Sequence, residues 1–245
     1  MDRIIKYNNK LTTWDNKYLK RNPDPYIEPW PTDGLIGRWR LSSNLNDSVN
    51  ALNFSVTYGT EAYDAGKDGN ALTWTDGAVF EVDNATTLGA VFNGTHAFSM
   101  LFWYKMISVV DSIIIIMSTD GTATWSGQTG SASVRAHSNS LNATEYGRKP
   151  GKEKYNDLTP DVNLWNHWML IYDENYTKLY VNNTLIGTCA ADTTSEVDVR
   201  YLRINCKLTG LGGGCVNGAM QNLYLYDKAL SESDRGILYN SGTPL

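Results

Sequence analysis

The chain has 245 residues, of which 42% are hydrophobic, 11% aromatic and 19% charged. This hydrophobic content excludes a wholly disordered chain, and the length fits one large all-β domain or two small domains. The net charge of −5 argues against a nucleic-acid-binding protein, and the three widely spaced cysteines argue against a disulfide framework and a Cys-x-x-Cys zinc site.

Residues 1–22 differ in charge from the rest of the chain. They contain six Lys or Arg and two Asp or Glu, a net charge of +4, whereas the remaining residues contain fifteen and twenty-four, a net charge of −9. Three short strands are predicted between residues 3 and 19, separated by Asn-Asn and Asp-Asn turns. So small a sheet is not stable alone, so we expect it to pack on the main domain or on a partner, as an anchoring or oligomerisation leader.

Residues 22–31, "NPDPYIEPWP", contain four of the seven prolines. Proline fixes its own φ and favours extended geometry in the residue before it, so ten such residues span about 30 Å. The sequence predicts a Pro-rich linker over residues 23–33, with Tyr26 and Trp30 available to pin part of it to a surface.

From residue 34 to residue 245, strand and turn signals alternate and predict a single domain. The predicted strand segments are 35–41, 70–74, 78–82, 97–106, 112–117, 167–173, 178–187, 199–205 and 220–227, with a turn flanked by strands over 44–56. Segment 112–117 is apolar on both faces, which predicts an inner strand, and segment 178–187 is itself a predicted hairpin around Asn182 and Asn183. Residues 119–161 are polar and irregular, which is typical of a surface loop or a pair of edge strands. One short helix is predicted near the end, where Ser231 is a good N-cap and Gly242 follows the last turn.

The clearest alternation lies in residues 98–105. Phe98, Met100, Phe102 and Tyr104 share one face of this strand, and Ser99, Leu101, Trp103 and Lys105 share the other. About a dozen strands without an intervening long helix predict an all-β sandwich of antiparallel sheets and exclude a parallel βαβ fold.

Five segments, taken in order, resemble laminin-G-like domains of the concanavalin A-like lectin type. The segments are "GLIGRWRLSSNLNDSVN" (34–50), "GKDGNALTW" (66–74), "FSMLFWYK" (98–105), "WNHWMLIYDENYTKLYVNNTLIG" (165–187) and "NGAMQNLYLYDKALSESDRGILYNSG" (217–242). The resemblance implies a jelly-roll sandwich in which the last strand pairs with the first. It also implies that Asp47 shapes the turn after the first strand.

Some relatives of this fold are glycoside hydrolases with a Glu-x-Asp-x-x-Glu strand. Glu-x-Asp occurs here at 81–83 and at 196–198, but neither copy has the closing Glu, and no Gly-x-Ser-x-Gly or His-Glu-x-x-His is present. His167 lies between Trp165 and Trp168, so we interpret it as a packed strand residue. The sequence predicts a protein that is not an enzyme and has no catalytic residue, with a glycoside hydrolase as the weaker alternative.

Two kinds of binding site follow from the resemblance. Relatives bind calcium near the first and last strands, and Asp47, Asn222 and the carbonyls of residues 66–70 are the candidate ligands here, although Gln221 and Asn222 replace two carboxylates of the pattern. Relatives also bind sugars through aromatic faces, for which Trp103, Trp125 and Tyr146 are the candidates.

The N-terminal residues lack the apolar stretch of an export signal, and the longest apolar run, 113–117, is too short to span a membrane. Laminin-G-like domains occur on bacteriophage virions, and residues 4–20 resemble Asn- and Lys-rich leaders of such proteins. We therefore expect a virion structural protein, a head decoration, head fibre or tail component, that meets other virion proteins through its leader and displays a lectin-like sandwich for glycans. The alternative is a secreted or surface bacterial carbohydrate-binding module. Homo-oligomerisation is left open, and no nucleic-acid or membrane partner is predicted.

Overall fold

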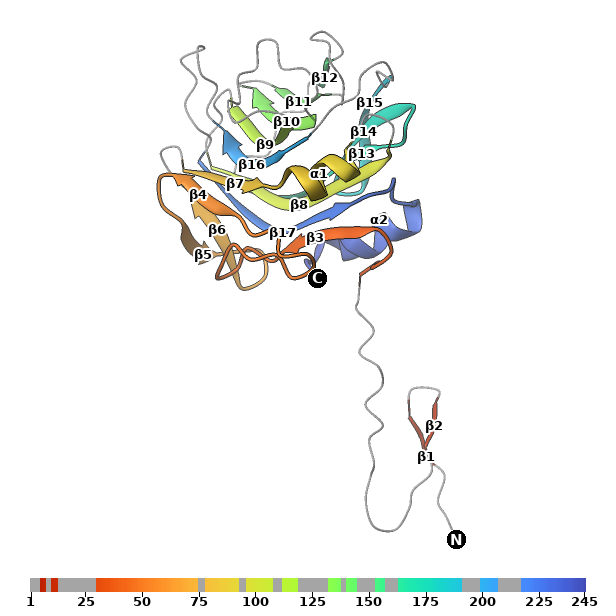
Figure 1. Ribbon diagram of the computed structural model, residues 1–245. Helices are drawn as coiled ribbons and strands as arrows, with labels where there is room; N and C mark the ends of the chain where they lie inside the picture. The colour runs from red at the N-terminus through yellow and green to blue at the C-terminus, as the bar shows by residue number, and fades with distance from the viewer. Residues whose placement is uncertain are drawn as a thin grey trace.

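The computed structural model describes residues 5–7, 10–12, 30–74, 78–92, 96–107, 112–118, 132–137, 140–144, 153–156, 163–190, 199–206 and 217–245. Within this part of the chain, two antiparallel sheets stack on each other (Figure 1). The predicted all-β jelly-roll sandwich is confirmed. None of the described helices is long and apolar enough to cross a membrane.

The larger sheet has eight strands. In order across the sheet they are β15 (Thr184–Ala190), β14 (Tyr176–Val181), β13 (Trp165–Tyr172), β8 (Phe98–Met106), β17 (Gly218–Tyr226), β6 (Asn70–Trp74) and β5 (Ala62–Ala65), and β3 (Leu35–Trp39) also pairs with β17. The predicted pairing of the last strand with the first is confirmed, because Leu223 lies opposite Trp39.

The smaller sheet has seven strands. In order they are β12 (Glu153–Asn156), β11 (Ser140–Thr144), β10 (Ala132–His137), β9 (Ser112–Ser118), β16 (Tyr201–Cys206), β7 (Val79–Asp83) and β4 (Ser55–Tyr58). The stretch 119–161, predicted as irregular or as a pair of edge strands, thus supplies three strands at one edge. Apart from the sandwich, β1 (Ile5–Tyr7) and β2 (Lys10–Thr12) form a hairpin, and the third predicted leader strand, 17–19, lies outside the described residues.

The core lies between the sheets and follows the period-2 pattern of the strands. Phe98, Met100, Phe102 and Tyr104 of β8 are all buried in it, which confirms the predicted alternation. Buried side chains of β7, β9 and β16 meet them from the smaller sheet; these are Phe80, Val82, Ile115, Met117, Leu202 and Ile204. The apolar segment 112–117 was predicted as an inner strand, and β9 indeed lies between two neighbours.

Helix α2 (Glu232–Tyr239) covers the opposite face of the larger sheet. Its N-cap is Ser231, whose hydroxyl accepts a hydrogen bond from the Asp234 amide at 3.1 Å, as predicted. Leu238 packs with Leu101 and other buried residues of this face in a second hydrophobic cluster. The outer face of this sheet is therefore partly interior, and any side chain beneath α2 is shielded from solvent.

A second helix, α1 (Ala85–Val91), was not predicted. The Asn84 side chain caps it by accepting a hydrogen bond from the Thr87 amide at 2.9 Å, and Leu88 and Val91 are buried. Its Thr-Thr-Leu-Gly sequence has a low intrinsic helix propensity, so burial of these two side chains sets the conformation. Of the two strands predicted to flank the turn within 44–56, the second is present as β4, whereas in place of the first only an isolated bridge joins Asp47 to Trp39.

Trp30 attaches the start of the sandwich to the outer face of the larger sheet. The Arg38 guanidinium carbon lies 3.7 Å from the centre of the Trp30 ring, and the Tyr224 ring lies 6.4 Å from it. The Tyr226 hydroxyl donates a hydrogen bond to the Pro31 carbonyl at 2.9 Å. We call these contacts the Trp30 clasp; Tyr26, the other candidate for pinning the linker, lies outside the described residues.

Candidate functional site

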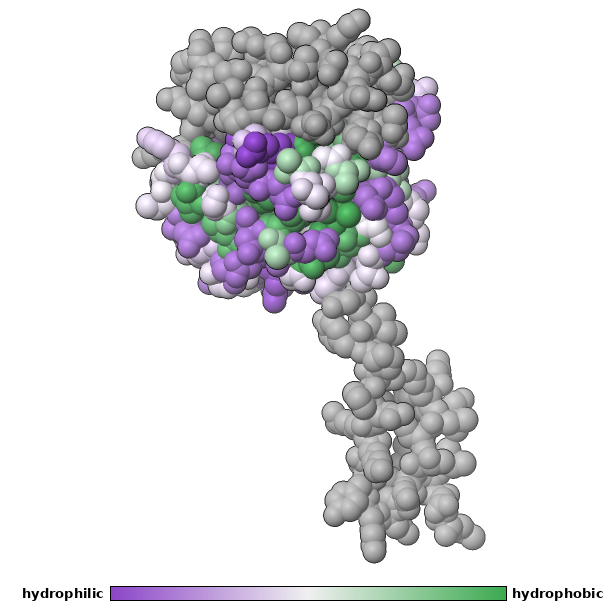
Figure 2. Space-filling model, in the orientation of Figure 1, coloured by the Kyte–Doolittle hydropathy of each residue, from purple (hydrophilic) through white to green (hydrophobic). Residues whose placement is uncertain are grey.

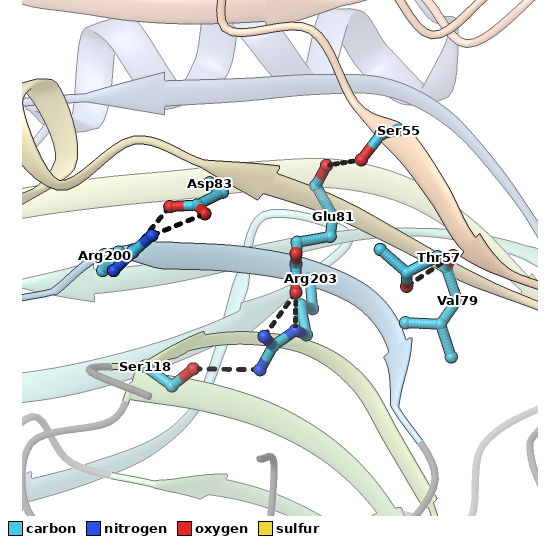
Figure 3. A network of polar contacts seen from close by, with 8 residues as sticks. All are labelled: Ser55, Thr57, Val79, Glu81, Asp83, Ser118, Arg200 and Arg203. Carbon is cyan, nitrogen blue, oxygen red and sulfur yellow. Dashed lines mark hydrogen bonds and ion pairs between the residues drawn. The ribbon is translucent and has the colours of Figure 1, made fainter. Parts of the chain in front are cut away.

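The outer face of the smaller sheet carries charged and aromatic side chains where β7 and β16 pair. The register places Arg203 opposite Glu81 and Tyr201 opposite Asp83. Side chains alternate along a strand, and Leu202, between the two β16 residues, is in the core. These four side chains therefore share the outer face, which we call the Tyr201 face. Figure 3 shows Glu81, Asp83 and Arg203 of this face.

Two arginine–carboxylate pairs hold the Tyr201 face together. Arg200 forms a bidentate ion pair with Asp83, in which Nε donates to Oδ1 at 2.6 Å and Nη2 donates to Oδ2 at 2.9 Å. About half of each side chain is exposed. Arg203 binds Glu81, and these side chains are only 4% and 16% exposed. Hydrogen bonds from Arg200 hold the pKa of Asp83 below its ordinary value, because they favour the charged carboxylate.

Tyr201 contacts both arginines. The guanidinium carbons of Arg200 and Arg203 lie 5.1 and 4.4 Å from the centre of its ring. Ser118 on β9 accepts a long hydrogen bond of 3.5 Å from Arg203, and the Ser55 hydroxyl donates to the Glu81 carbonyl at 3.1 Å. Strongly hydrophilic residues gather in this region in the space-filling view (Figure 2). An aromatic ring among fixed donors and acceptors suits a ligand with both hydroxyls and an apolar face.

The same geometry does not suit hydrolysis. Retaining and inverting glycosidases need one carboxyl group kept protonated, which requires a raised pKa. Glu81 and Asp83 form one of the Glu-x-Asp pairs noted in the sequence, and each is paired with an arginine. The hydrogen bonds from Arg200 lower the pKa of Asp83, which is the opposite of what an acid catalyst needs. The strand then ends, and Thr86, at the position of the missing Glu, lies in α1. The other Glu-x-Asp, 196–198, lies outside the described residues.

Trp103, the first predicted sugar-binding residue, is 2% exposed. It belongs to the face that α2 covers, and the rings of His167 and Tyr239 lie 4.9 and 6.2 Å from its own. It has no open face for a sugar in this arrangement. Trp125 and Tyr146 lie outside the described residues, so their grouping with Trp103 stays a prediction.

The Asp47 carboxylate is saturated by main-chain hydrogen bonds. Its carboxylate accepts four main-chain N–H bonds of 2.7 to 3.1 Å, from Arg38, Val49, Asn50 and Leu52. The bond from Val49, two residues on, is the expected turn contact. A carboxylate has about four acceptor positions, so none is left for a metal ion.

The side-chain amides of Gln221 and Asn222 on the last strand, β17, also form hydrogen bonds with main-chain groups. Asn222, with φ of 50°, donates a hydrogen bond to the Leu245 carbonyl at 2.8 Å. The Gln221 amide binds main-chain groups of Lys67 and Asp68, and Gly66 permits this approach because a Cβ there would lie 2.9 Å from the Gln221 oxygen. Within the described ranges, no three His, Cys, Asp or Glu residues gather. The donor set thus does not fit calcium bound by Asp47 and Asn222.

Replacing Asp47 by alanine is expected to lower the free energy of unfolding by about 3 kcal/mol, because four N–H donors lose a charged acceptor. Asp47→Asn, which keeps one acceptor oxygen, is expected to lose about half as much. Urea unfolding of the three proteins measures this. A melting temperature that rises with calcium in the native chain, but not in Asp47→Ala, would instead support Asp47 as a calcium ligand.

Two curved antiparallel sheets with a polar, aromatic outer face define a lectin-like β-sandwich. The chain belongs to the concanavalin A-like lectin/glucanase superfamily, because the laminin-G model of that superfamily matches residues 80–234. The resemblance seen in the sequence motifs is confirmed at this level. No match was found among curated proteins.

Solved structures of binding domains and enzymes share the fold. The binding domain of Paraclostridial mosquitocidal protein 1 has a TM-score of 0.66 at 16% identity, and 85% of this chain covers 52% of that one. Trypanosoma rangeli sialidase in complex with sialic acid has a TM-score of 0.65 at 14% identity, and the match covers 85% of this chain and 33% of the sialidase. Domain 4 of the Geobacillus stearothermophilus arabinanase AbnA, in complex with arabinotriose, has a TM-score of 0.59 at 15% identity, and the match covers 82% of this chain and 95% of that domain. The chain thus spans about half or less of the first two.

Sequence reasoning noted Glu81 and Asp83 but missed Arg200, Tyr201 and Arg203. Tyr201 and Arg203 alternate with core residues in "VRYLRIN", so the face of the strand could have been found from the pattern. What the pattern does not give is the pairing of β16 with β7, since Arg203 and Glu81 are 122 residues apart.

Proposed function

We propose that the chain is a non-enzymatic carbohydrate-binding protein and that the Tyr201 face is its sugar site. The observation that carries this proposal is the Tyr201 ring, which is half-buried and held by contacts with two guanidinium groups. A ring fixed in this way loses little conformational entropy when a sugar stacks on it. The exposed Arg200–Asp83 pair next to it offers donors and acceptors to sugar hydroxyls.

The pairing of charges also favours binding of uncharged sugars at this face. Each arginine already has a carboxylate partner, so an anionic sugar would compete with Asp83 or Glu81. The hydroxyls of a neutral sugar can instead bond to the free lone pairs and N–H groups at the rim of the Arg200–Asp83 pair. The arabinotriose in the complex of AbnA domain 4 is a neutral oligosaccharide on a sandwich of this fold, which supports the proposal by analogy.

Tyr201→Ala is expected to weaken the binding of the best neutral glycan at least about 10-fold, because the stacking ring is lost. A glycan array identifies that glycan, and titration calorimetry measures both proteins. Tyr176→Ala is the matched control, since Tyr176 is exposed on the other sheet. Equal affinities for the native chain and Tyr201→Ala, or an array with no neutral glycan bound, would reject the site.

We further propose that the sandwich is displayed on a bacteriophage virion, as a head decoration, fibre or tail component. The charge of +4 on residues 1–22, against −9 on the rest, supports docking of the leader on an acidic virion protein. The Trp30 clasp supports a fixed exit for the Pro-rich linker. The alternative setting is the bacterial cell surface or the extracellular medium, as a carbohydrate-binding module.

Co-sedimentation with particles tests this setting. The full chain is expected to sediment with virions, whereas a chain that starts at Pro29, and so keeps the Trp30 clasp, is expected to stay in the supernatant. If both or neither sediment, the leader is not a virion anchor, and the bacterial module becomes the better account.

A further inference from the structure

Two lysines lie over tryptophan rings on the outer face of the larger sheet, beside α2. The Lys67 nitrogen is 4.6 Å from the centre of the Trp103 ring, and the Lys105 nitrogen is 5.5 Å from the centre of the Trp165 ring. Trp103 and Lys105 are alternate residues of β8, so they point the same way and start about 7 Å apart. Trp165 lies directly opposite Lys105 in the neighbouring strand, β13. We call Lys67, Lys105 and Trp165, with Trp103 beneath them, the lysine–tryptophan patch.

The two lysines have no carboxylate partner within the described ranges. Lys178, Arg200, Arg203 and Lys228 each form an ion pair with Asp or Glu there. Lys67 forms none, even with its neighbour Asp68, and neither does Lys105. A cation–π contact leaves the charge on the ammonium group, so among the described residues the patch carries net positive charge, on a protein whose overall charge is −5.

The floor of the patch adds no negative charge. Trp103 packs against His167, which is 1% exposed, and both nitrogens of that imidazole lack a hydrogen-bond partner. Tyr239 of α2 stacks over both rings, at 6.2 and 5.9 Å. An apolar, uncharged floor reduces screening of the two ammonium groups above it, so an anion there would be bound more strongly than on an ordinary surface.

Trp165 gives the patch its second recognition element. Its side chain is half-buried, and Leu164 before it is 57% exposed, so an apolar surface borders the two cations. A lone inorganic anion would use only the lysines. A ligand that uses both elements must carry an anionic group and, next to it, a ring with an apolar face, which describes an acidic sugar.

We propose that the lysine–tryptophan patch binds the carboxylate or sulfate of an acidic saccharide, whose sugar ring stacks on Trp165. The inference rests on the proposed function as a glycan-binding protein, but not on the Tyr201 face, which belongs to the other sheet. The two faces then bind different ligands: neutral sugars bind beside the arginine–carboxylate pairs, and acidic sugars bind at the two lysines.

The experiment is a glycan array of matched pairs, probed with the full chain: sialylated, uronic acid and sulfated glycans beside their desialylated, carboxyl-reduced or desulfated counterparts. At least one acidic glycan is expected to bind about 10-fold more tightly than its counterpart. Raising the salt from about 0.15 to about 0.5 M is expected to weaken that binding several-fold and to leave neutral binding unchanged.

The variants assign the binding to the patch. Lys67→Gln/Lys105→Gln is expected to abolish the preference for acidic glycans, whereas Lys67→Arg/Lys105→Arg keeps it. Lys178→Gln/Lys228→Gln, which also removes two positive charges but at lysines paired with Asp173 and Asp33, is the matched control and is expected to keep it. Sulfated and carboxylated pairs, read separately, show which anion is bound.

The outcomes separate this inference from the sugar site on the other sheet. An acidic preference that the glutamine variant retains, or an array with no acidic preference, overturns the inference even if neutral glycans bind through Tyr201. An acidic preference lost in the glutamine variant but kept in Tyr201→Ala supports it even if no neutral glycan binds.

Discussion

Replacing Glu81 by leucine is expected to destabilise the fold by about 4 kcal/mol, because it leaves the Arg203 guanidinium nearly buried without the carboxylate that pairs with it. Arginine stays protonated at any accessible pH, so the protein cannot relieve this charge by neutralising it. Chemical unfolding at neutral pH measures the loss. A loss below about 1 kcal/mol would mean that solvent reaches the guanidinium and that the pair acts as a surface ion pair.

The reverse change gives the matched comparison. Arg203→Leu removes the partner of Glu81, but the Glu81 side chain is more exposed than that of Arg203, so the expected loss of stability is smaller. The double variant Glu81→Leu/Arg203→Leu is expected to recover most of the stability, since two apolar side chains replace two buried charges. A double variant as unstable as the sum of the single ones would contradict this account.

His167 is expected to make the fold sensitive to mild acid. Burial lowers its pKa to about 3, from an ordinary value of 6.5, because the charged imidazole is poorly solvated beneath Tyr239. Between these two pH values, His167 is therefore protonated in the unfolded chain and neutral in the folded chain. The contribution of the neutral His167 to the free energy of unfolding is complete above pH 6.5. It is lost as the pH falls toward 3, at up to about 1.4 kcal/mol per pH unit. Between pH 8 and 4.5 the expected loss is about 2.5 kcal/mol.

Unfolding free energies of the native chain and His167→Gln at several pH values test this expectation. The variant is expected to be less stable at pH 8 but to lose little more between pH 8 and 4.5. His96→Gln is the matched control, because His96 is exposed, and it is expected to keep the native slope. The interval stops at 4.5 because Asp83 and Asp173, whose pKa values are lowered, add their own acid dependence below it. A native slope unchanged in His167→Gln would show that another group causes the sensitivity.

The features predicted correctly from the sequence are those with a local period or a local turn. The alternation in residues 98–105 gives the two faces of β8 without knowledge of its neighbours. The hairpin of β14 and β15 turns at Asn182 and Asn183, whose φ angles of 49° and 62° are the left-handed values that asparagine tolerates. In both cases the physics lies within a few residues, so one sequence is enough.

The sites could be predicted only in part because they depend on contacts between distant segments. The sequence placed Trp103 on the correct face of its strand, but α2, which covers that face, lies more than 100 residues later. The carboxylate of Asp47 suggested a metal ligand, and only the loop conformation shows that four N–H groups occupy it. The charge and chemical type of each residue can be read from a sequence, whereas the groups that pair with a charged side chain depend on the fold.

The Trp30 clasp determines how the sandwich would bear a mechanical load. A pull on the chain ahead of Trp30 reaches the ring and the Pro31 carbonyl before it reaches β3. The contacts that resist it lie on two strands, Arg38 on β3 and Tyr224 and Tyr226 on β17. Tension is thus shared with a central strand of the larger sheet, and β3 is not peeled from its end one hydrogen bond at a time.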